Sequence, residues 1–417
     1  MSELGRPTAV LVDAYTTGNF LPPAFDRLGV DVLHVQSTPE LMKSMLGPNL
    51  AAYRGNFVCD TPQATTARLA QLEPLCVVAG QEPGVELADE LAELLKVPTN
   101  GTALSVARRN KYEMIETLRR AGVRCARQFK SSDVEAIVEW SQAEGYPVVV
   151  KPLSSAATDG VRVCAGPEQV RDAAKAVLAT ETIYYERNRE VLVQSYLAGT
   201  EYVVDMVSCE GRRYTCGVWE YDKRLVNGTH NIYDREFVLP PDESPVPELI
   251  AYVNTALDAL GVRFGPTHAE VILTADGPTL VEVGARLAGN MHPGFHDVVV
   301  GANQADLTAL AYVQPQRFLA EYADRPYRKL REACVYTAPT EADGVVDRVD
   351  TDVVAEMEAL ESVYGVNVKI QPGGRIRPTV DLYTSTLRIF MSAGSRAELD
   401  RDYERLQQLK DRVYILR

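Results

Sequence analysis

The sequence predicts an α/β and α+β protein of several domains, and three observations carry this prediction. With 417 residues the chain is too long for one small core. Up to residue 95, short apolar strands alternate with helical segments, the order that builds a parallel sheet covered by helices. From residue 331 the pattern changes to short strands followed by a helical tail. We therefore expect three domains, over residues 1–105, 106–330 and 331–417.

Composition narrows the classes of function. The chain is 46% apolar and 24% charged, as soluble globular proteins are. It has no apolar run long enough to cross a bilayer and no signal-peptide core, so we expect a cytoplasmic protein without membrane partners. A formal charge of −14 argues against a nucleic-acid partner, because such a partner needs a basic face. The seven cysteines are scattered without a C-x-x-C pair, which predicts reduced thiols.

The N-terminal region predicts a parallel sheet with flanking helices. Its expected strands are residues 8–13, 30–35, 57–59 and 75–79, and its expected helices are residues 20–28, 61–72 and 81–95. No G-x-G-x-x-G follows the first strand, so the dinucleotide fingerprint is absent. Glu82 comes just after the fourth strand, where ligands bind in such sheets. It either faces a substrate there or complements the N-terminus of the next helix.

The next region predicts a phosphate contact. Helices are expected over residues 110–120 and 134–144, and the apolar strand 146–151 carries Lys151 at its end. The loop that follows contains Ser154, Ser155, Asp159 and Gly160. Small side chains let backbone amides approach an anion, and a lysine adds a point charge. An ordinary surface loop has the same composition, so this pattern is weak by itself.

Residues 190–201 predict a strand and a turn, and residues 202–207 predict the next strand. An adenine can lie in such a crease, with hydrogen bonds to the backbone at Tyr196 and Leu197 and with Glu201 on the ribose hydroxyls. The alternative is a plain hairpin.

The polar segment of residues 219–236 is expected to be irregular, and loops of this kind often hold substrate. It contains Glu220 and His230.

Residues 267–290 carry the strongest chemical pattern. Glu270 and Glu282 lie on two short apolar runs joined by the turn Asp276-Gly277-Pro278, which predicts a hairpin with one carboxylate on each strand. Side chains alternate faces along a strand, so both carboxylates can point to one side, where they repel unless a cation lies between them. Oxygen ligands suit magnesium, and Arg286 adds donors for a phosphate or carboxylate. The alternative is an exposed hairpin with solvated acids.

The remaining elements follow from periodicity. Helices are expected over residues 249–260 and 306–313, in the middle of the chain. In the C-terminal region the expected strands are residues 333–337, 366–371 and 387–391, and the expected helix is residues 396–409.

The order of these parts resembles the ATP-grasp superfamily, across nearly the whole chain. The motifs that carry the resemblance are A-G-Q-E-P-G-V-E-L-A-D from Ala79, R-R-N-K-Y-E-M from Arg108 and V-E-V-G-A-R-L-A-G-N from Val281. The chain looks most similar to carboxylate–amine ligases such as the L-amino acid (dipeptide) ligases of the bacilysin-synthetase kind and carnosine synthase. The resemblance implies an ATP-grasp fold with an N-terminal Rossmann-like domain and a small C-terminal α+β domain.

The resemblance also implies roles for particular residues. ATP would be held by Lys111, Lys151, Gln194, Tyr196, Leu197 and Glu201. Glu270 and Glu282 would hold magnesium, with two ions expected, and Arg286 would contact the transferring phosphate. Many ATP-grasp enzymes have Asn two residues after the second glutamate, and here that position is Gly284, which favours the dipeptide-ligase branch. Asn290 is expected to line the amine pocket.

The expected reaction joins a small-molecule carboxylate to an amine through an acyl phosphate, with release of ADP and phosphate. Because water destroys acyl phosphates, residues 154–160 are the candidate lid. Glu220 or His230 is the candidate general base, and the sequence does not choose between them. A homodimer is also expected. Two alternatives stay open: a carboxylating or formyl-phosphate enzyme of purine-type metabolism, and a non-catalytic nucleotide-binding module of the synapsin kind.

Overall fold

The computed structural model describes residues 6–417 except 156–158, 227–229 and 383. The chain forms two compact units. The first comprises Met1–Cys216, Ser244–Pro293 and Ala302–Tyr327, and the second comprises Gly217–Glu243, Gly294–Gly301 and Arg328–Arg417. The finer division into three domains stays a prediction. None of the helices in the described part of the chain has both the length and the apolar character that a membrane crossing needs.

A parallel sheet begins the first unit, as predicted. Its strands lie in the order β3-β2-β1-β4, with β1 (Thr8–Val12), β2 (Asp31–Gln36), β3 (Asn56–Val58) and β4 (Val77–Ala79). The helices of this part are η1 (Thr16–Phe20), α1 (Leu21–Arg27), η2 (Leu50–Ala52), α2 (Pro62–Leu69), η3 (Ala70–Leu72), η4 (Glu82–Gly84) and α3 (Val85–Leu95). Side chains alternate along β1, so that Leu11 packs in one core cluster with Phe25 of α1 and Val12 packs in another with Leu91 of α3. Both faces of this sheet are therefore covered by helices.

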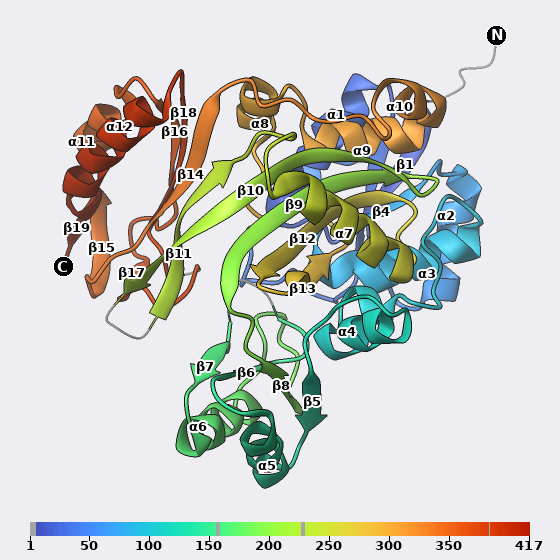
Figure 1. Ribbon diagram of the computed structural model, residues 1–417. Helices are drawn as coiled ribbons and strands as arrows, with labels where there is room; N and C mark the ends of the chain where they lie inside the picture. The colour runs from blue at the N-terminus through green and yellow to red at the C-terminus, as the bar shows by residue number, and fades with distance from the viewer. Residues whose placement is uncertain (1–5, 156–158, 227–229, 383) are drawn as a thin grey trace. The chain divides into compact units, whose positions relative to one another are not determined.

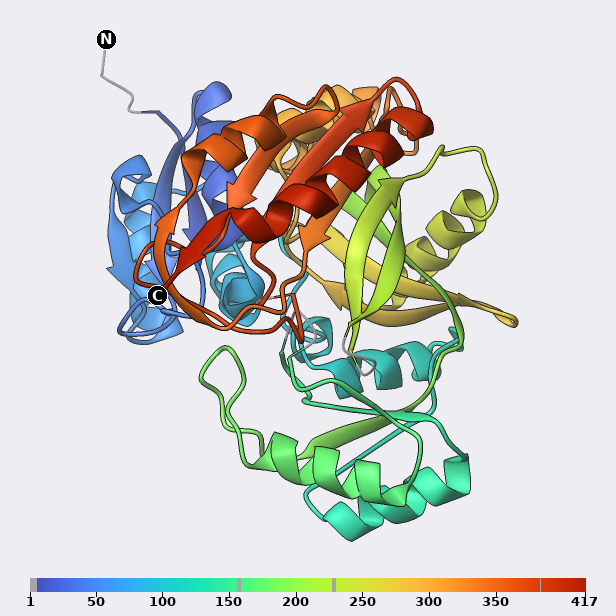
Figure 2. The same cartoon turned by 90° about the vertical axis from the view of Figure 1, so that its left-hand side faces the viewer.

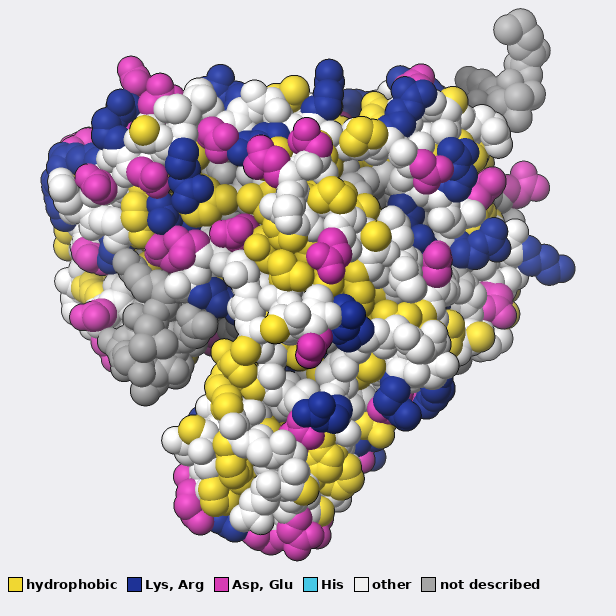
Figure 3. All heavy atoms as spheres, viewed as in Figure 1, with side chains coloured by type: hydrophobic (Ala, Val, Ile, Leu, Met, Phe, Trp, Pro, Cys, Tyr) yellow, Lys and Arg dark blue, Asp and Glu magenta, His cyan; other side chains and the backbone are white. Residues whose placement is uncertain are grey.

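A second, smaller sheet of the first unit is antiparallel. Its order is β5-β8-β6-β7, with β5 (Gln128–Ser131), β6 (Val148–Lys151), β7 (Arg162–Cys164) and β8 (Val191–Ser195). Helices α5 (Val134–Glu144) and α6 (Pro167–Leu178) lie side by side on one face of it (Figures 1 and 2). Arg171 of α6 links the two helices through an ion pair to Glu135 of α5. On the face of the molecule that Figure 3 shows, acidic and basic side chains are intermixed.

The first unit also contains three strands that pair antiparallel in the order β13-β12-β9. They are β9 (Gly199–Cys209), β12 (Gly265–Thr274) and β13 (Gly277–Gly284). The helices around these strands are η5 (Val106–Arg108), α4 (Lys111–Arg120), α7 (Val246–Ala259), α9 (Gln304–Val313) and α10 (Pro315–Glu321). Helix α4 begins where Asn110 accepts hydrogen bonds from the amides of Tyr112 and Glu113, so this N-cap sets the position of Lys111.

The second unit is an α+β structure, as predicted for the C-terminal region. Strand β10 (Arg212–Val226) enters it from the first unit, and β11 (His230–Val238), β14 (Glu332–Ala338), β18 (Leu387–Ala393) and β16 (Val363–Val368) continue the antiparallel order. A small sheet has the order β17-β15-β19, with β15 (Gly344–Val349), β17 (Arg375–Ile376) and β19 (Tyr414–Leu416). Its helices are α8 (Pro293–Val300), α11 (Thr351–Glu358), α12 (Arg396–Leu409) and η6 (Lys410–Arg412). A capping box of Ser395 and Glu398 starts α12 at the predicted residue.

The prediction of an irregular segment over residues 219–236 is wrong. Its described residues belong to β10 and β11, which pair antiparallel with a bulge at Asp222. Two of its polar residues, Asp222 and Arg235, form an ion pair across the strands at 3.0 Å. Buried Tyr221 and Tyr233 pack against each other in the same hairpin, with ring centroids 4.2 Å apart and ring planes tilted by 41°.

Candidate active site

Two glutamates face each other on the hairpin β12–β13. The strand register places Glu270 opposite Glu282, with a bulge directly after Glu270. Each side chain is only 18% exposed. The structure thus confirms the pairing of the two carboxylates that the sequence predicted. Because like charges opposite each other repel, the pair needs positive charge nearby.

Lys111 supplies part of this charge. Its ammonium lies 2.5 Å from Glu282 Oε2 and donates a 2.6 Å hydrogen bond to the carbonyl oxygen of Ser155. The amide of Lys111 also donates to the carbonyl of Leu153 at 2.9 Å. The first turn of α4, the loop after β6 and the glutamate pair are therefore joined at this lysine.

His268 and Asp205 are site residues that the sequence analysis missed. His268 Nδ1 lies 2.7 Å from Asp205 Oδ1, and its Nε2 lies 3.5 Å from Glu270 Oε1. Burial disfavours the imidazolium, but Asp205 and Glu270 outweigh it and raise the pKa of His268 to about 9. The period of two along a strand could have found His268, because it lies two residues before Glu270 and on the same face.

The donor set fits magnesium. Within the described residues, no group of three or more His, Cys, Asp or Glu side chains is arranged to hold a metal ion. Magnesium usually takes one or two carboxylates from the protein and completes its shell with water and phosphate oxygens. Glu270 and Glu282 fit that requirement. Since Lys111 already contacts Glu282, ion binding has to displace this ammonium or share the carboxylate with it.

Lys151 ends strand β6 and is 4% exposed. Burial, and next the charge of Lys111, lower the pKa of Lys151 to about 8, against the opposing effect of Glu282, Glu270 and Glu201. The charges of both glutamates thus act on Lys151, and its role toward phosphate stays a prediction.

This pKa predicts a pH dependence. Lys151 is mostly charged at pH 7 and loses its charge above about pH 8, so kcat/KM for ATP should fall on the order of tenfold by pH 9. Lys151→Arg keeps its charge over this range and should flatten the profile. Steady-state rates from pH 7 to pH 9.5 would test this, and a wild-type profile that is flat up to pH 9.5 would contradict it.

Arg286 pairs with Glu82. Its Nε lies 3.2 Å from Glu82 Oε2, and its Nη1 donates a 3.0 Å hydrogen bond to the carbonyl of Leu287. The two charged side chains are 10% and 12% exposed. Burial raises the pKa of Glu82, and Arg286 opposes that shift. The structure leaves both interpretations of Glu82 open. Glu82 lies in the first turn of η4, as a residue that complements a helix N-terminus does, and it also forms an ion pair with Arg286.

Gly284 explains how this pair fits beside the two facing glutamates. A Cβ at Gly284 would lie 2.9 Å from Arg286 Cζ and 3.1 Å from Glu82 Oε2. Any larger residue would push these side chains apart. The glycine that departs from the common ATP-grasp pattern is therefore matched to the Arg286–Glu82 pair.

The residues predicted to hold the adenosine lie where β8 passes into β9. Gln194 is 5% exposed on β8 and donates to Gln128 Oε1 at 2.9 Å. Tyr196 is 44% exposed in the connection that also contains Leu197, and Glu201 is buried on β9. Their roles toward ATP stay predictions.

Side-chain contacts hold the described part of the predicted lid, among them the hydrogen bond from Lys111 to the carbonyl of Ser155. Ser155 Oγ donates to Asp159 Oδ2 at 2.6 Å, and Ser154 precedes them. Gly160 has φ +67°, and a Cβ there would lie 2.9 Å from the Pro152 side chain, so this position requires glycine. Residues 156–158 lie outside the described residues, and the lid role stays a prediction.

The sequence also predicted site roles for Glu220, His230 and Asn290, and these roles stay predictions. Glu220 lies on β10 in the second unit, opposite Phe237. The side chain of His230 is outside the described part of the structure. Asn290 is partly buried just before Met291, whose side chain belongs to a core cluster of the first unit.

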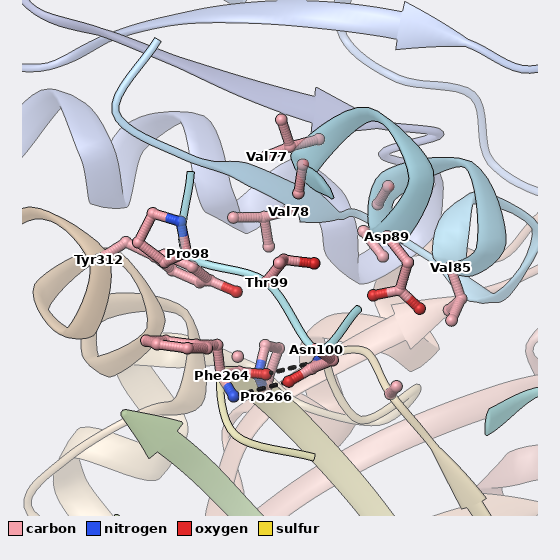
Figure 4. A pocket seen from close by; sticks show the side chains of 15 residues that line it. Val77, Val78, Val85, Asp89, Pro98, Thr99, Asn100, Phe264, Pro266 and Tyr312 are labelled. Carbon is pink, nitrogen blue, oxygen red and sulfur yellow. Dashed lines mark hydrogen bonds between the residues drawn. The ribbon is translucent and has the colours of Figure 1, made fainter. Parts of the chain in front are cut away.

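A small enclosed hollow in the first unit is not a substrate site. It measures about 30 Å³ and lies between β4, α3 and the start of β12 (Figure 4). That volume holds about one water molecule. Asn100 crosses beneath it and donates to the carbonyl of Phe264 at 3.0 Å, an interaction drawn in Figure 4.

Comparisons with known proteins identify the family. The ATP-grasp domain family matches residues 144–293. Dapdiamide A synthase of Enterobacter agglomerans is 34% identical over 388 residues, which cover 91% of this chain and 90% of that protein.

Solved structures share the fold. L-amino acid ligase from Bacillus licheniformis has a TM-score of 0.76 at 19% identity and covers 99% of both chains. The biotin carboxylase domain of Hydrogenobacter thermophilus 2-oxoglutarate carboxylase, in complex with MgADP and bicarbonate, has a TM-score of 0.65 at 13% identity and covers 100% of this chain and 91% of that chain. Given its identity to dapdiamide A synthase over nine-tenths of both chains, this chain belongs to the ATP-grasp family of ATP-dependent ligases that form C–N bonds.

Proposed function

We propose that this protein joins the carboxylate of one amino-acid-like substrate to the amine of another through an acyl phosphate. The observation that carries the proposal is the concentration of charge around the glutamate pair, where Lys111 contacts Glu282 and where the charge of Glu282 acts on Lys151 and Arg286. The names of its 34% identical relative and of a structure with the same fold, an L-amino acid ligase, support the same reaction class.

The chemistry follows from this charge. A carboxylate is a poor electrophile, and transfer of the γ-phosphoryl group of ATP to it gives an acyl phosphate that an amine can attack. The amine then displaces phosphate and forms the amide, so that ADP and phosphate are the products. Such transfer needs positioning and neutralisation of charge rather than a covalent adduct with the protein. In this proposal Lys111 and Lys151 bind the phosphates, and Arg286 stabilises the phosphoryl group in transit.

Glu270 and Glu282 hold the metal in this proposal. The expected two magnesium ions would supply positive charge that offsets the charge of the phosphates when bound. His268 fixes the orientation of Glu270, since it contacts that carboxylate and is itself held by Asp205. Gln194, Tyr196, Leu197 and Glu201 take the adenosine, and the loop with Ser154, Ser155, Asp159 and Gly160 closes over the phosphates.

A screen of amino-acid pairs that reads released phosphate tests the proposal. We expect phosphate release that depends on both a carboxylate donor and an amine, with an equal amount of amide found by mass spectrometry. An acid labelled with heavy oxygen in its carboxylate should pass one label to the phosphate, because attack occurs at the γ-phosphorus. Pyrophosphate as the product, or label in AMP, would contradict the acyl-phosphate route. Stimulation by bicarbonate or formate in place of an amino acid would favour the purine-type alternative.

A further inference from the structure

Residues 180–188 form a short hairpin of their own between α6 and β8. The amide of Thr182 donates to the carbonyl of Glu186 at 2.8 Å, and the amide of Tyr185 donates to the carbonyl of Thr182 at 2.9 Å. Asn188 closes the base with a 3.1 Å hydrogen bond to the carbonyl of Thr180. These hydrogen bonds within the segment define its turn.

The two adjacent tyrosines of the hairpin differ in their exposure to solvent. Tyr185 has φ +61°, in the left-handed region, and is 56% exposed. Tyr184 is only 6% exposed. A bulky residue in the left-handed region is unfavourable by itself, so the turn that aims Tyr184 inward is maintained by the contacts around it.

Tyr184 lies at the border of the candidate site. It packs with Tyr15 and Met42, which belong to loops at the carboxyl edge of the parallel sheet. The guanidinium of Arg109 is 5.6 Å from the centre of its ring. Tyr15 is followed by Thr16, whose hydroxyl accepts a 2.7 Å hydrogen bond from Gln81, the residue before Glu82. The ring of Tyr184 thus packs on the loop that is bonded to the segment in which Glu82 pairs with Arg286.

Arg109 ties this hairpin to the rest of the site. Its guanidinium forms ion pairs with Glu186 of the hairpin and with Glu86 of α3, the latter at 3.5 Å. Arg109 stands two residues before Lys111, whose ammonium contacts Glu282. The hairpin, α3 and the start of α4 are therefore connected through one arginine, whose side chain is 14% exposed.

We propose that Tyr184 is a specificity-determining wall of the pocket for the carboxylate-donating substrate, held in place by the Arg109–Glu186 pair. The inference rests on the proposed function, in which the acid must reach the phosphoryl group beside Arg286. A buried aromatic ring packed on these loops limits the size of the acid's side chain. In this proposal the same ring also keeps water from the acyl phosphate.

The test compares Tyr184→Ala with Tyr185→Ala, a control that removes the neighbouring ring from the solvent side of the same hairpin. L-Alanine, L-valine and L-phenylalanine serve as carboxylate donors with one constant amine, and amide and ADP are both measured. For Tyr184→Ala we expect the ratio of kcat/KM for the bulky acid to that for the small acid to rise about tenfold. We also expect less amide per ADP formed. Tyr185→Ala should behave as the wild type.

Two further variants keep the inference falsifiable. Tyr184→Leu retains apolar packing with Met42 and should shift the preference in the same direction even if the alanine variant does not fold. Glu186→Gln weakens the link to Arg109 and should reduce amide per ADP, with KM for ATP unchanged. Wild-type protein that forms no amide from any pair would refute the proposed function. Wild-type activity combined with unchanged acid preference and coupling in a folded Tyr184 variant would overturn only this inference.

Discussion

Replacement of Glu282 by Gln is expected to lower turnover about a thousandfold while the protein stays folded. The substitution removes one of two facing carboxylates, so the donor set for magnesium loses an anion and the γ-phosphate loses its position. It also removes the acid partner of Lys111, which keeps its hydrogen bond to the carbonyl of Ser155. Steady-state rates measured over a wide range of magnesium concentration would show the loss, with partial recovery at high magnesium.

The same hairpin offers a matched control for this variant. Asp276 is an exposed carboxylate in the turn between β12 and β13. Asp276→Asn should leave the rate and its magnesium dependence unchanged. It also removes one negative charge from this hairpin, but at a position away from Glu270 and Glu282. If Glu282→Gln turned over at nearly the normal rate at ordinary magnesium, Glu282 would not be a metal ligand.

The parts of the site that the sequence predicted are those set by local pattern. Glu270 and Glu282 were found because a turn joins two short apolar runs and because strand side chains alternate. Helix α12 was found to the residue because its cap and its period are both local.

The parts that were missed depend on partners far away in the chain. His268 is held by Asp205, which is 63 residues away, and Glu82 meets Arg286 across 204 residues. No pattern in one sequence shows which distant strand will lie beside another. Strands β10 and β11 were mistaken for a loop for the same reason, since Asp222 and Arg235, which look like loop residues in the sequence, pair across the two strands.

Replacement of Arg286 by Met is expected to impair both catalysis and stability. The rate constant kcat should fall about a hundredfold or more, with a smaller change in KM for ATP, since the arginine acts mainly on the phosphoryl group in transit. Stability should fall by about 3 kcal/mol, because Glu82 is left buried without its cation. Single-turnover rates and denaturant unfolding separate the two effects.

The pH dependence of the stability loss identifies its cause. Burial already raises the pKa of Glu82, and loss of Arg286 raises it further, so the folded variant holds a proton that the unfolded chain releases. Below about pH 4, Glu82 is protonated in both states and this part of the deficit is absent. As pH rises toward the folded pKa, the unfolded chain ionises first and the stability of Arg286→Met falls. Glu82→Gln added to Arg286→Met should remove this pH dependence and restore stability without restoring kcat. A double variant as unstable as the single one would mean that Arg286 stabilises the fold through other contacts, such as the one to the carbonyl of Leu287.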